Sequence, residues 1–152
     1  MKPNAVVLRP HWQYAIKRDG TQRSRQRCDG SERAAPKLRQ MDLTWSSCVK
    51  LPIQKLFLGI AASKSLKLYG GDAKDAYAHA HPSETPGYLS IDNQHADWYK
   101  CKYRNDIDCR QVLPIERALQ GHPESGEQWM HHIDSILDKI GFIKAKHDHS
   151  IY

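Results

Sequence analysis

Apolar and polar residues alternate near the start of the chain. The segment from Trp12 to Lys17 alternates in character and then meets Asp19-Gly20-Thr21, a sequence typical of a tight turn. We expect the return strand over residues 22–27, ending at Asp29-Gly30. The pattern therefore predicts a β-hairpin.

Further along, the apolar residues take a helical spacing. After Pro52 they recur at positions 53, 56, 57, 60 and 61, and Pro52 falls in the first turn, where its missing N–H is harmless. The spacing predicts an amphipathic helix whose apolar side faces a core.

A second amphipathic helix is expected near the end of the chain. Ser125 and Gln128 have the spacing of a capping box, and one apolar stripe runs from Trp129 to Ile140. Gly141 stands where a glycine commonly ends a helix. We therefore predict a helix that starts near Ser125 and stops before Gly141.

Shorter patterns suggest further elements. Residues 66–69 alternate as a short strand that leads into Gly70-Gly71-Asp72, and residues 73–80 are compatible with a helix. Residues 88–91 suggest a strand, 98–100 start a helix or a strand, and 142–143 with 150–152 suggest the arms of a further hairpin. Since the chain stops in the second arm, we expect it to end inside a fold. With 152 residues, one α+β domain is expected.

The charge of the chain favours phosphate-bearing partners. Lys and Arg number 23 against 17 Asp and Glu, a net charge of +6, and arginine is concentrated between Arg18 and Arg39. A solvated, partly disordered arm is the alternative interpretation of this segment.

Other classes of protein find little support. No apolar leader and no stretch of ~18 apolar residues is present, so we expect a soluble intracellular protein, cytoplasmic or nuclear, with no membrane partner. The four cysteines lack zinc-ligand spacing and are expected to be reduced and unbridged. No serine or cysteine nucleophile motif appears. The paired histidines are expected to be ordinary exposed residues (His79, His81, His131, His132, His147, His149).

The sharpest segment is Gly70-Gly71-Asp72-Ala73-Lys74-Asp75-Ala76-Tyr77. A carboxylate at a strand end is rigidly held and can bind Mg²⁺, although an Asp after two glycines is also a common turn residue or helix N-cap. The segment resembles the first palm motif of reverse transcriptases, D-x-x-x-A-[FY]. The resemblance implies that Asp72 is a catalytic metal ligand, that the Ala73 carbonyl contacts the metal, and that Asp75 and Ala76 hold the triphosphate. Tyr77 would exclude ribonucleotides.

Two more blocks extend the resemblance. The run Leu113-Pro114, Ala118 to Gly126 and Trp129 is similar to the copia-type block L-Y-G-L-K-Q-A-P-R-x-W, which implies that Gln120 and Gly121 line the nucleotide site. It departs from the block where Pro123 to Gly126 replace the usual Lys and Arg. The tail, from Ile140 through Tyr152, is similar to G-F-x-x-s-x-x-D-x-s-l-[FY].

The predicted hairpin resembles the fingers hairpin of the same family, I-K-x-x-D-G-x followed by K-A-R-L-V-A-x-G. This likeness implies that Lys17 and Arg25 lie over the incoming triphosphate and that Arg18, Arg23 and Arg27 bind nucleic acid. The resemblance covers residues 12–152, which leaves residues 1–11 as an N-terminal extension. The Tyr-x-Asp-Asp motif of these enzymes does not occur in the chain.

Taken together, the blocks resemble the fingers and first part of the palm of a copia-type retrotransposon reverse transcriptase, an α+β partial right-hand polymerase fold. The resemblance implies RNA-directed DNA synthesis with an RNA template, a DNA primer, dNTP and Mg²⁺. Because the catalytic Asp-Asp pair is missing, we expect an incomplete or degenerate copy that is inactive alone. The alternatives are a non-catalytic basic nucleic-acid-binding remnant and a small interaction domain that matches by chance.

Overall fold

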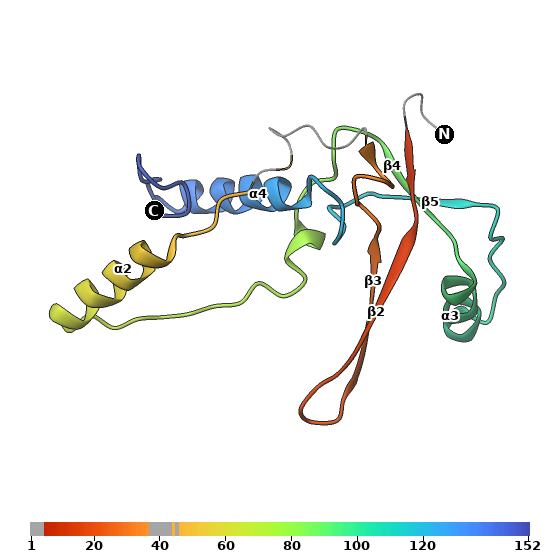
Figure 1. Cartoon of the computed structure of the whole chain (residues 1–152), viewed down its shortest axis with the longest axis horizontal. Coiled ribbons are helices and arrows are strands. Elements are labelled where there is room, and N and C mark those ends of the chain that lie inside the picture. Colours follow the sequence, from red (N-terminus) through yellow and green to blue (C-terminus); the bar gives the residue numbers. More distant parts are fainter. Residues whose placement is uncertain (1–4, 37–43, 45) are drawn as a thin grey trace.

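The computed structural model describes residues 5–36, 44 and 46–152 and has a mixed α+β architecture. Its described part contains three α-helices, a short 3₁₀ helix and two small sheets. In Figure 1 a long hairpin projects from the body, with α3 on one side of it and α4 on the other. The predicted fold class, a mixture of helices and sheets of the α+β type, is confirmed.

The alternating N-terminal segment forms the predicted hairpin. Strands β2 (Pro10–Ile16) and β3 (Gln22–Cys28) pair antiparallel along their whole length. Pro10 is the first residue of its strand, where a missing N–H is tolerated. At the turn Gly20 has a φ of 81°, and the backbone N–H of Thr21 donates to Asp19 Oδ1 at 2.9 Å.

The second sheet joins distant parts of the chain. Strands β1 (Val6–Leu8) and β4 (Gly87–Ser90) pair parallel, and β5 (Val112–Pro114) pairs antiparallel with β4. Leu8 and Leu89 form the centre of a small core with Cys28 and Ala35. The strand predicted near residue 88 is confirmed, whereas β1 and β5 were not expected.

Helix α2 (Leu51–Ser63) lies where the spacing predicts it, but its predicted burial is wrong. The side chains of Leu56 and Phe57 are 63% and 61% exposed, and Ala61 is the buried residue of the helix. Figure 1 shows the reason, since α2 stands apart from both sheets and from α3.

The strand predicted at residues 66–69 is also wrong. Residues 64–75 run as an extended connection from α2 back towards the body in Figure 1, and no strand is assigned there. A strand needs a hydrogen-bonded neighbour, and the two sheets of the described residues do not include this segment. Tyr69 is 90% exposed as a result.

The segment left open around Trp98 belongs to helix α3 (Asn93–Tyr103). Its N-cap is Asp92, whose side chain accepts the backbone N–H of His95 at 2.7 Å. None of the described helices has the length and apolar character needed to cross a membrane.

Helix α4 (Ser125–Lys139) confirms the second predicted helix but not its capping box. Its N-cap is Glu124, and the Ser125 hydroxyl donates to the Leu119 carbonyl at 2.8 Å instead of capping the helix. The other end is as predicted: Gly141 has a φ of 90° and its N–H donates to the Asp138 carbonyl at 3.0 Å.

Two further predictions fail for local reasons. The helix expected over 73–80 is reduced to one 3₁₀ turn, η2 (Ala76–His79), because Asp75 takes a left-handed backbone conformation that an α-helix cannot pass through. The terminal hairpin is absent from the described residues. Its segments share the contact in which Ala145 N–H donates to the Ile151 carbonyl at 2.8 Å, and they form no strand.

Candidate functional site

An open cleft of about 560 Å³ lies between the hairpin, the segment around η2 and the loop that precedes α4. Three separate stretches of the sequence line it, namely residues 23–26, 72–78 and 118–120. Many of the predicted site residues meet here (Arg23, Arg25, Asp72, Ala73, Asp75, Ala76, Tyr77, Gln120). The lining also includes residues that the sequence analysis missed (Gln26, Lys74, Ala78, Ala118, Leu119).

The register of the hairpin explains why its arginines share one side. Side chains alternate along a strand, so Arg23, Arg25 and Arg27 lie on the same face of β3. The opposite face carries Trp12 and Tyr14 of β2, whose side chains contact the N-terminal part of α3. The arginine face is therefore turned away from α3, and its first two arginines line the cleft.

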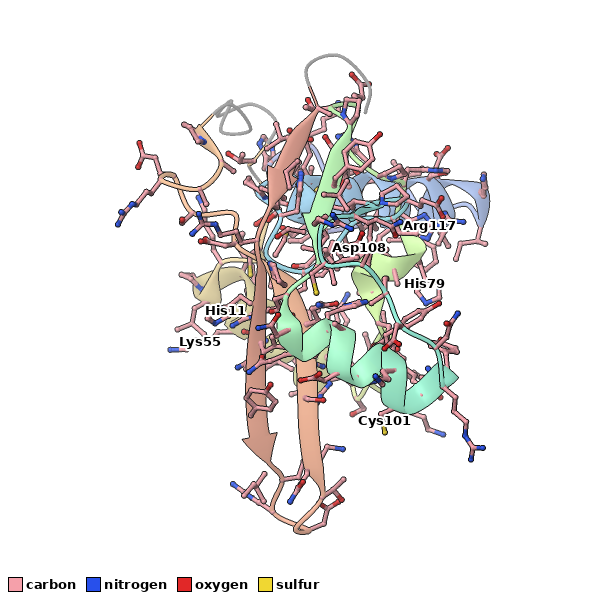
Figure 2. All side chains as sticks on the ribbon, turned by 90° about the vertical axis from the view of Figure 1, so that its right-hand side faces the viewer. His11, Lys55, His79, Cys101, Asp108 and Arg117 are labelled. Carbon is pink, nitrogen blue, oxygen red and sulfur yellow. The ribbon has the colours of Figure 1, made fainter. Side chains whose placement is uncertain are left out.

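The segment that carries Asp72 reaches the cleft as a loop. Asp72 is exposed and does not end a strand, so the predicted rigid support for its carboxylate is wrong. The hydrogen-bonded turn begins at Asp75, whose backbone φ is 51° and whose carbonyl accepts the Ala78 N–H at 2.8 Å. His79 closes the turn, with Nε2 at 3.2 Å from the Lys74 carbonyl oxygen, and lies on η2 in Figure 2.

Tyr77 is half-buried within this turn. Its carbonyl accepts the Ala80 N–H at 3.1 Å, and Ala80 is fully buried. The Ala80 carbonyl in turn accepts the Ala118 N–H at 3.5 Å, which connects the turn to the loop before α4. These backbone contacts hold Tyr77 at the wall of the cleft.

The third wall is joined to the hairpin by a close approach of two backbones. The Cys28 N–H donates to the Gln120 carbonyl at 3.0 Å. A Cβ on Gly121, whose φ is 92°, would lie 2.1 Å from the Cys28 carbonyl oxygen, and one on Gly30 would lie 2.0 Å from the Gly121 oxygen. Because no side chain fits between them, both glycines are required for this contact.

Cys28 at this junction is buried among apolar residues. All four cysteines are free, as expected, and Cys28 is the buried one. Burial raises the pKa of its thiol to about 12, so the thiol stays neutral and serves as a small core residue.

Behind the cleft, a buried polar cluster fixes the start of α4. The Ser83 hydroxyl donates to a Glu124 carboxylate oxygen, and the Glu124 N–H donates to His122 Nδ1 at 3.3 Å. Burial raises the pKa of the Glu124 carboxyl, with Glu127 and Glu84 acting in the same direction and Ser83 against it. Burial lowers the pKa of His122.

Not every predicted site residue reaches the cleft. Lys17 and Arg18 lie at the hairpin turn, beyond the last strand pair of Ile16 with Gln22. Lys17 is four residues further along the strand than Gln13, the partner of Arg25, which is about 13 Å at the rise of a strand. Arg27 and Gly121 also lie outside the lining.

The cleft carries three cations and two carboxylates. Arg23, Arg25 and Lys74 attract phosphate, while Asp72 and Asp75 with backbone carbonyls are the oxygen donors that Mg²⁺ prefers. No group of three or more His, Cys, Asp and Glu residues in the described part of the chain could hold a metal ion. These oxygen donors are of the kind that Mg²⁺ binds together with phosphate oxygens and waters.

Comparison with known proteins identifies no relative. No family model, no curated protein and no solved structure matches the chain.

Proposed function

We propose that the chain is the nucleotide- and nucleic-acid-binding part of a copia-type reverse transcriptase domain, comprising the fingers hairpin and the first part of the palm. One observation carries the proposal. Three blocks that resemble this family, far apart in the sequence, line a single cleft with Arg25, Asp72 and Gln120 among its walls. The convergence of these blocks on one cleft supports the proposal.

In this proposal the guanidinium groups of Arg23 and Arg25 bind phosphates, either of the incoming dNTP or of the primer and RNA template. Tyr77 presents its ring from the wall of the cleft to the sugar. Asp72 and the Ala73 carbonyl would hold Mg²⁺ together with phosphate oxygens, and the ion would neutralise charge on the phosphates. Gln120 is positioned by its backbone contact with Cys28.

The proposed role of this chain is binding. The sequence has no Tyr-x-Asp-Asp segment, and in-line transfer between two metals ~3.5–4 Å apart needs more carboxylates than the cleft supplies. We therefore expect no primer extension by the chain alone. Extension on a primed RNA template that disappears in Asp72→Asn would contradict this expectation.

The binding proposal is tested by replacing both cleft arginines with glutamine. Arg23→Gln with Arg25→Gln should weaken binding of a labelled primer–template. The slope of log affinity against log salt should also become shallower, by about 0.9 for each phosphate that the arginines no longer neutralise. Fluorescence anisotropy at several salt concentrations measures both quantities.

A control with the same charge change is Lys64→Gln with Lys67→Gln, because both lysines are exposed and lie outside the cleft. It should leave affinity and salt dependence nearly unchanged. Equal losses of affinity in the two double variants would show that only net charge matters, and the assignment of the cleft would be abandoned.

A non-catalytic nucleic-acid-binding remnant is the second candidate, and the exposed loop position of Asp72 favours it. The two candidates differ in the role of Mg²⁺. If Asp72 helps to hold the ion, Mg²⁺ should tighten dNTP binding in the unmodified protein and not in Asp72→Asn. In a remnant, the ion should have the same effect on both proteins.

A further inference from the structure

The C-terminal half of α3 carries a group of aromatic side chains, of which Trp98 and Tyr103 are exposed and Tyr99 is half-buried. Trp98 and Tyr103 are 44% and 53% exposed. Their rings contact edge to face, with centroids 6.0 Å apart, and Tyr99 lies 4.7 Å from Tyr103. Large aromatic residues grouped on a surface mark interaction sites more often than single exposed ones do.

This aromatic group is continuous with the hairpin. The buried His95 on the same side of α3 contacts the Trp98 ring at 5.5 Å and lies 2.9 Å from the side chain of Gln26 on β3. Tyr14 on β2 donates its hydroxyl to Gln94 at 3.1 Å. In Figure 2 α3 lies beside the hairpin, and Cys101 marks the C-terminal half of the helix that extends past it.

A lysine lies over the aromatic group. Lys102 Nζ lies 5.0 Å from the Trp98 ring centroid and 5.2 Å from that of Tyr103. Nearby, Lys100 pairs with Asp106 and Arg110 pairs with Asp108, each at 2.9 Å, so these four charges balance one another. Asp97, the acidic residue within α3, lies ~140° around the helix from Lys102 at ~100° per residue, and so on a different face of the helix.

We propose that this surface, made of Trp98, Tyr99, Lys102 and Tyr103, binds single-stranded nucleic acid by stacking unpaired bases. Aromatic rings beside cations are the elements with which proteins hold single strands without reading their sequence. The Lys102 ammonium favours a phosphate-bearing strand over an apolar protein partner, which would have to bury the charge together with the rings. None of these four residues lines the cleft, so the inference does not rest on the proposed function.

The test separates stacking from phosphate attraction. Two labelled strands of about 12 nucleotides are compared, one of deoxyadenosine and one abasic, so that they carry the same phosphates but only one carries bases. The full chain should bind the strand with bases roughly tenfold more tightly or better, since each stacked base contributes about 1–3 kcal/mol. This comparison requires no variant and therefore no assumption about folding.

Trp98→Leu with Tyr103→Leu keeps apolar bulk at two exposed positions and should reduce binding of the deoxyadenosine strand to the abasic level. Tyr69→Leu is the matched control, because Tyr69 is also highly exposed and lies outside this surface. Arg23→Gln with Arg25→Gln, which changes the cleft alone, should leave the preference for the strand with bases unchanged, and this separates a failure here from a failure of the cleft.

Equal affinity of the full chain for the two strands would overturn the proposal. So would a preference for bases that survives in Trp98→Leu with Tyr103→Leu, since the bases would then stack elsewhere. A preference that disappears in that variant and persists in Tyr69→Leu supports it.

Discussion

The residue with the most unusual environment is Glu124, whose side chain carries a carboxyl group into the interior. The residue is 5% exposed, and the Ser83 hydroxyl is its hydrogen-bond donor. Burial disfavours the charged form, so the pKa is raised in the folded protein and the folded state binds the proton more tightly than the unfolded state. By linkage, folding is penalised as the pH rises through the folded pKa.

We predict that Glu124→Gln stabilises the protein at neutral and alkaline pH. The glutamine oxygen still accepts from Ser83, and the buried charge is gone. The Tm should rise by about 2–4 °C at pH 8, and the gain should shrink towards zero near pH 4, where the carboxyl of the unmodified protein is protonated. Thermal unfolding followed by circular dichroism over that range measures the difference.

His122 acts in the opposite direction, since its lowered pKa makes the folded state less stable as the pH falls below the ordinary histidine range. Variant and parent must therefore be compared at each pH. Glu116→Gln, at an exposed position, serves as the control and should show little change. A gain for Glu124→Gln that grows towards acidic pH would contradict the assignment of Glu124 as the buried charge.

Among the elements, α3 and the hairpin share a carboxylate that is hydrogen-bonded to both. Asp92 accepts the His95 N–H at 2.7 Å as the helix N-cap and also accepts Trp12 Nε1–H at 3.0 Å. Two donors from two elements thus depend on the same side chain. Its removal should loosen the helix end and its contact with β2 together.

Asp92→Ala should lower the free energy of unfolding by about 1–3 kcal/mol, because it removes both the cap and the indole hydrogen bond. Asp92→Asn should cost less, since the amide oxygen can still cap the helix. Asp97→Ala, at an exposed position within α3, is the control. Urea unfolding gives the three values, and equal effects of Asp92→Ala and Asp97→Ala would show that Asp92 has no linking role.

The elements also show what the sequence could and could not predict. The hairpin and α4 were predictable because their signals are local: a turn at Asp19-Gly20, and an apolar stripe that ends at Gly141. Strands β1 and β5 have three residues each, too few for a period, and depend on partners far along the chain. The pattern at 66–69 was misleading, since alternation predicts a strand only if a neighbour is present.

The candidate site was predictable in part for a similar reason. Resemblance identified Arg25, Asp72 and Gln120 as members of one site, and all three line the same cleft. The position of Lys17 at the far end of the hairpin could not be predicted, because it depends on the length of the strands. The loop that carries Asp72 could not be predicted either, because it forms where the expected strand has no neighbour to pair with. Lys74 could have been noted from its charge within the Asp72 to Tyr77 segment.

At the scale of the molecule, the hydrophobic core formed by the described residues is small, and Leu8 is its largest fully buried side chain. This leucine is 1% exposed and packs with Leu89 and Ala35 between the sheets. Large apolar residues elsewhere, such as Phe57 and Leu66, are exposed and add little to stability. The free energy of unfolding must therefore depend strongly on a few positions.

Leu8→Ala should destabilise the protein by about 2–5 kcal/mol, which is a large share of the stability of an ordinary domain. Val7→Ala is the matched control on the same strand, since Val7 is 40% exposed and points to the other face. Its effect should be far smaller. Similar destabilisation in the two variants would place the stabilising core away from β1.

The parallel pairing of β1 with β4 also determines the order of events during folding. Val6 pairs with Gly87, so the three-stranded sheet closes a loop of about 80 residues and has a high contact order. The hairpin of β2 and β3, by contrast, can form within microseconds of leaving the ribosome. Leu8 must wait for Leu89 to be synthesised, which at ~5–20 residues per second leaves it uncovered for several seconds. In a cell, that interval is when chaperones would have access to the strand.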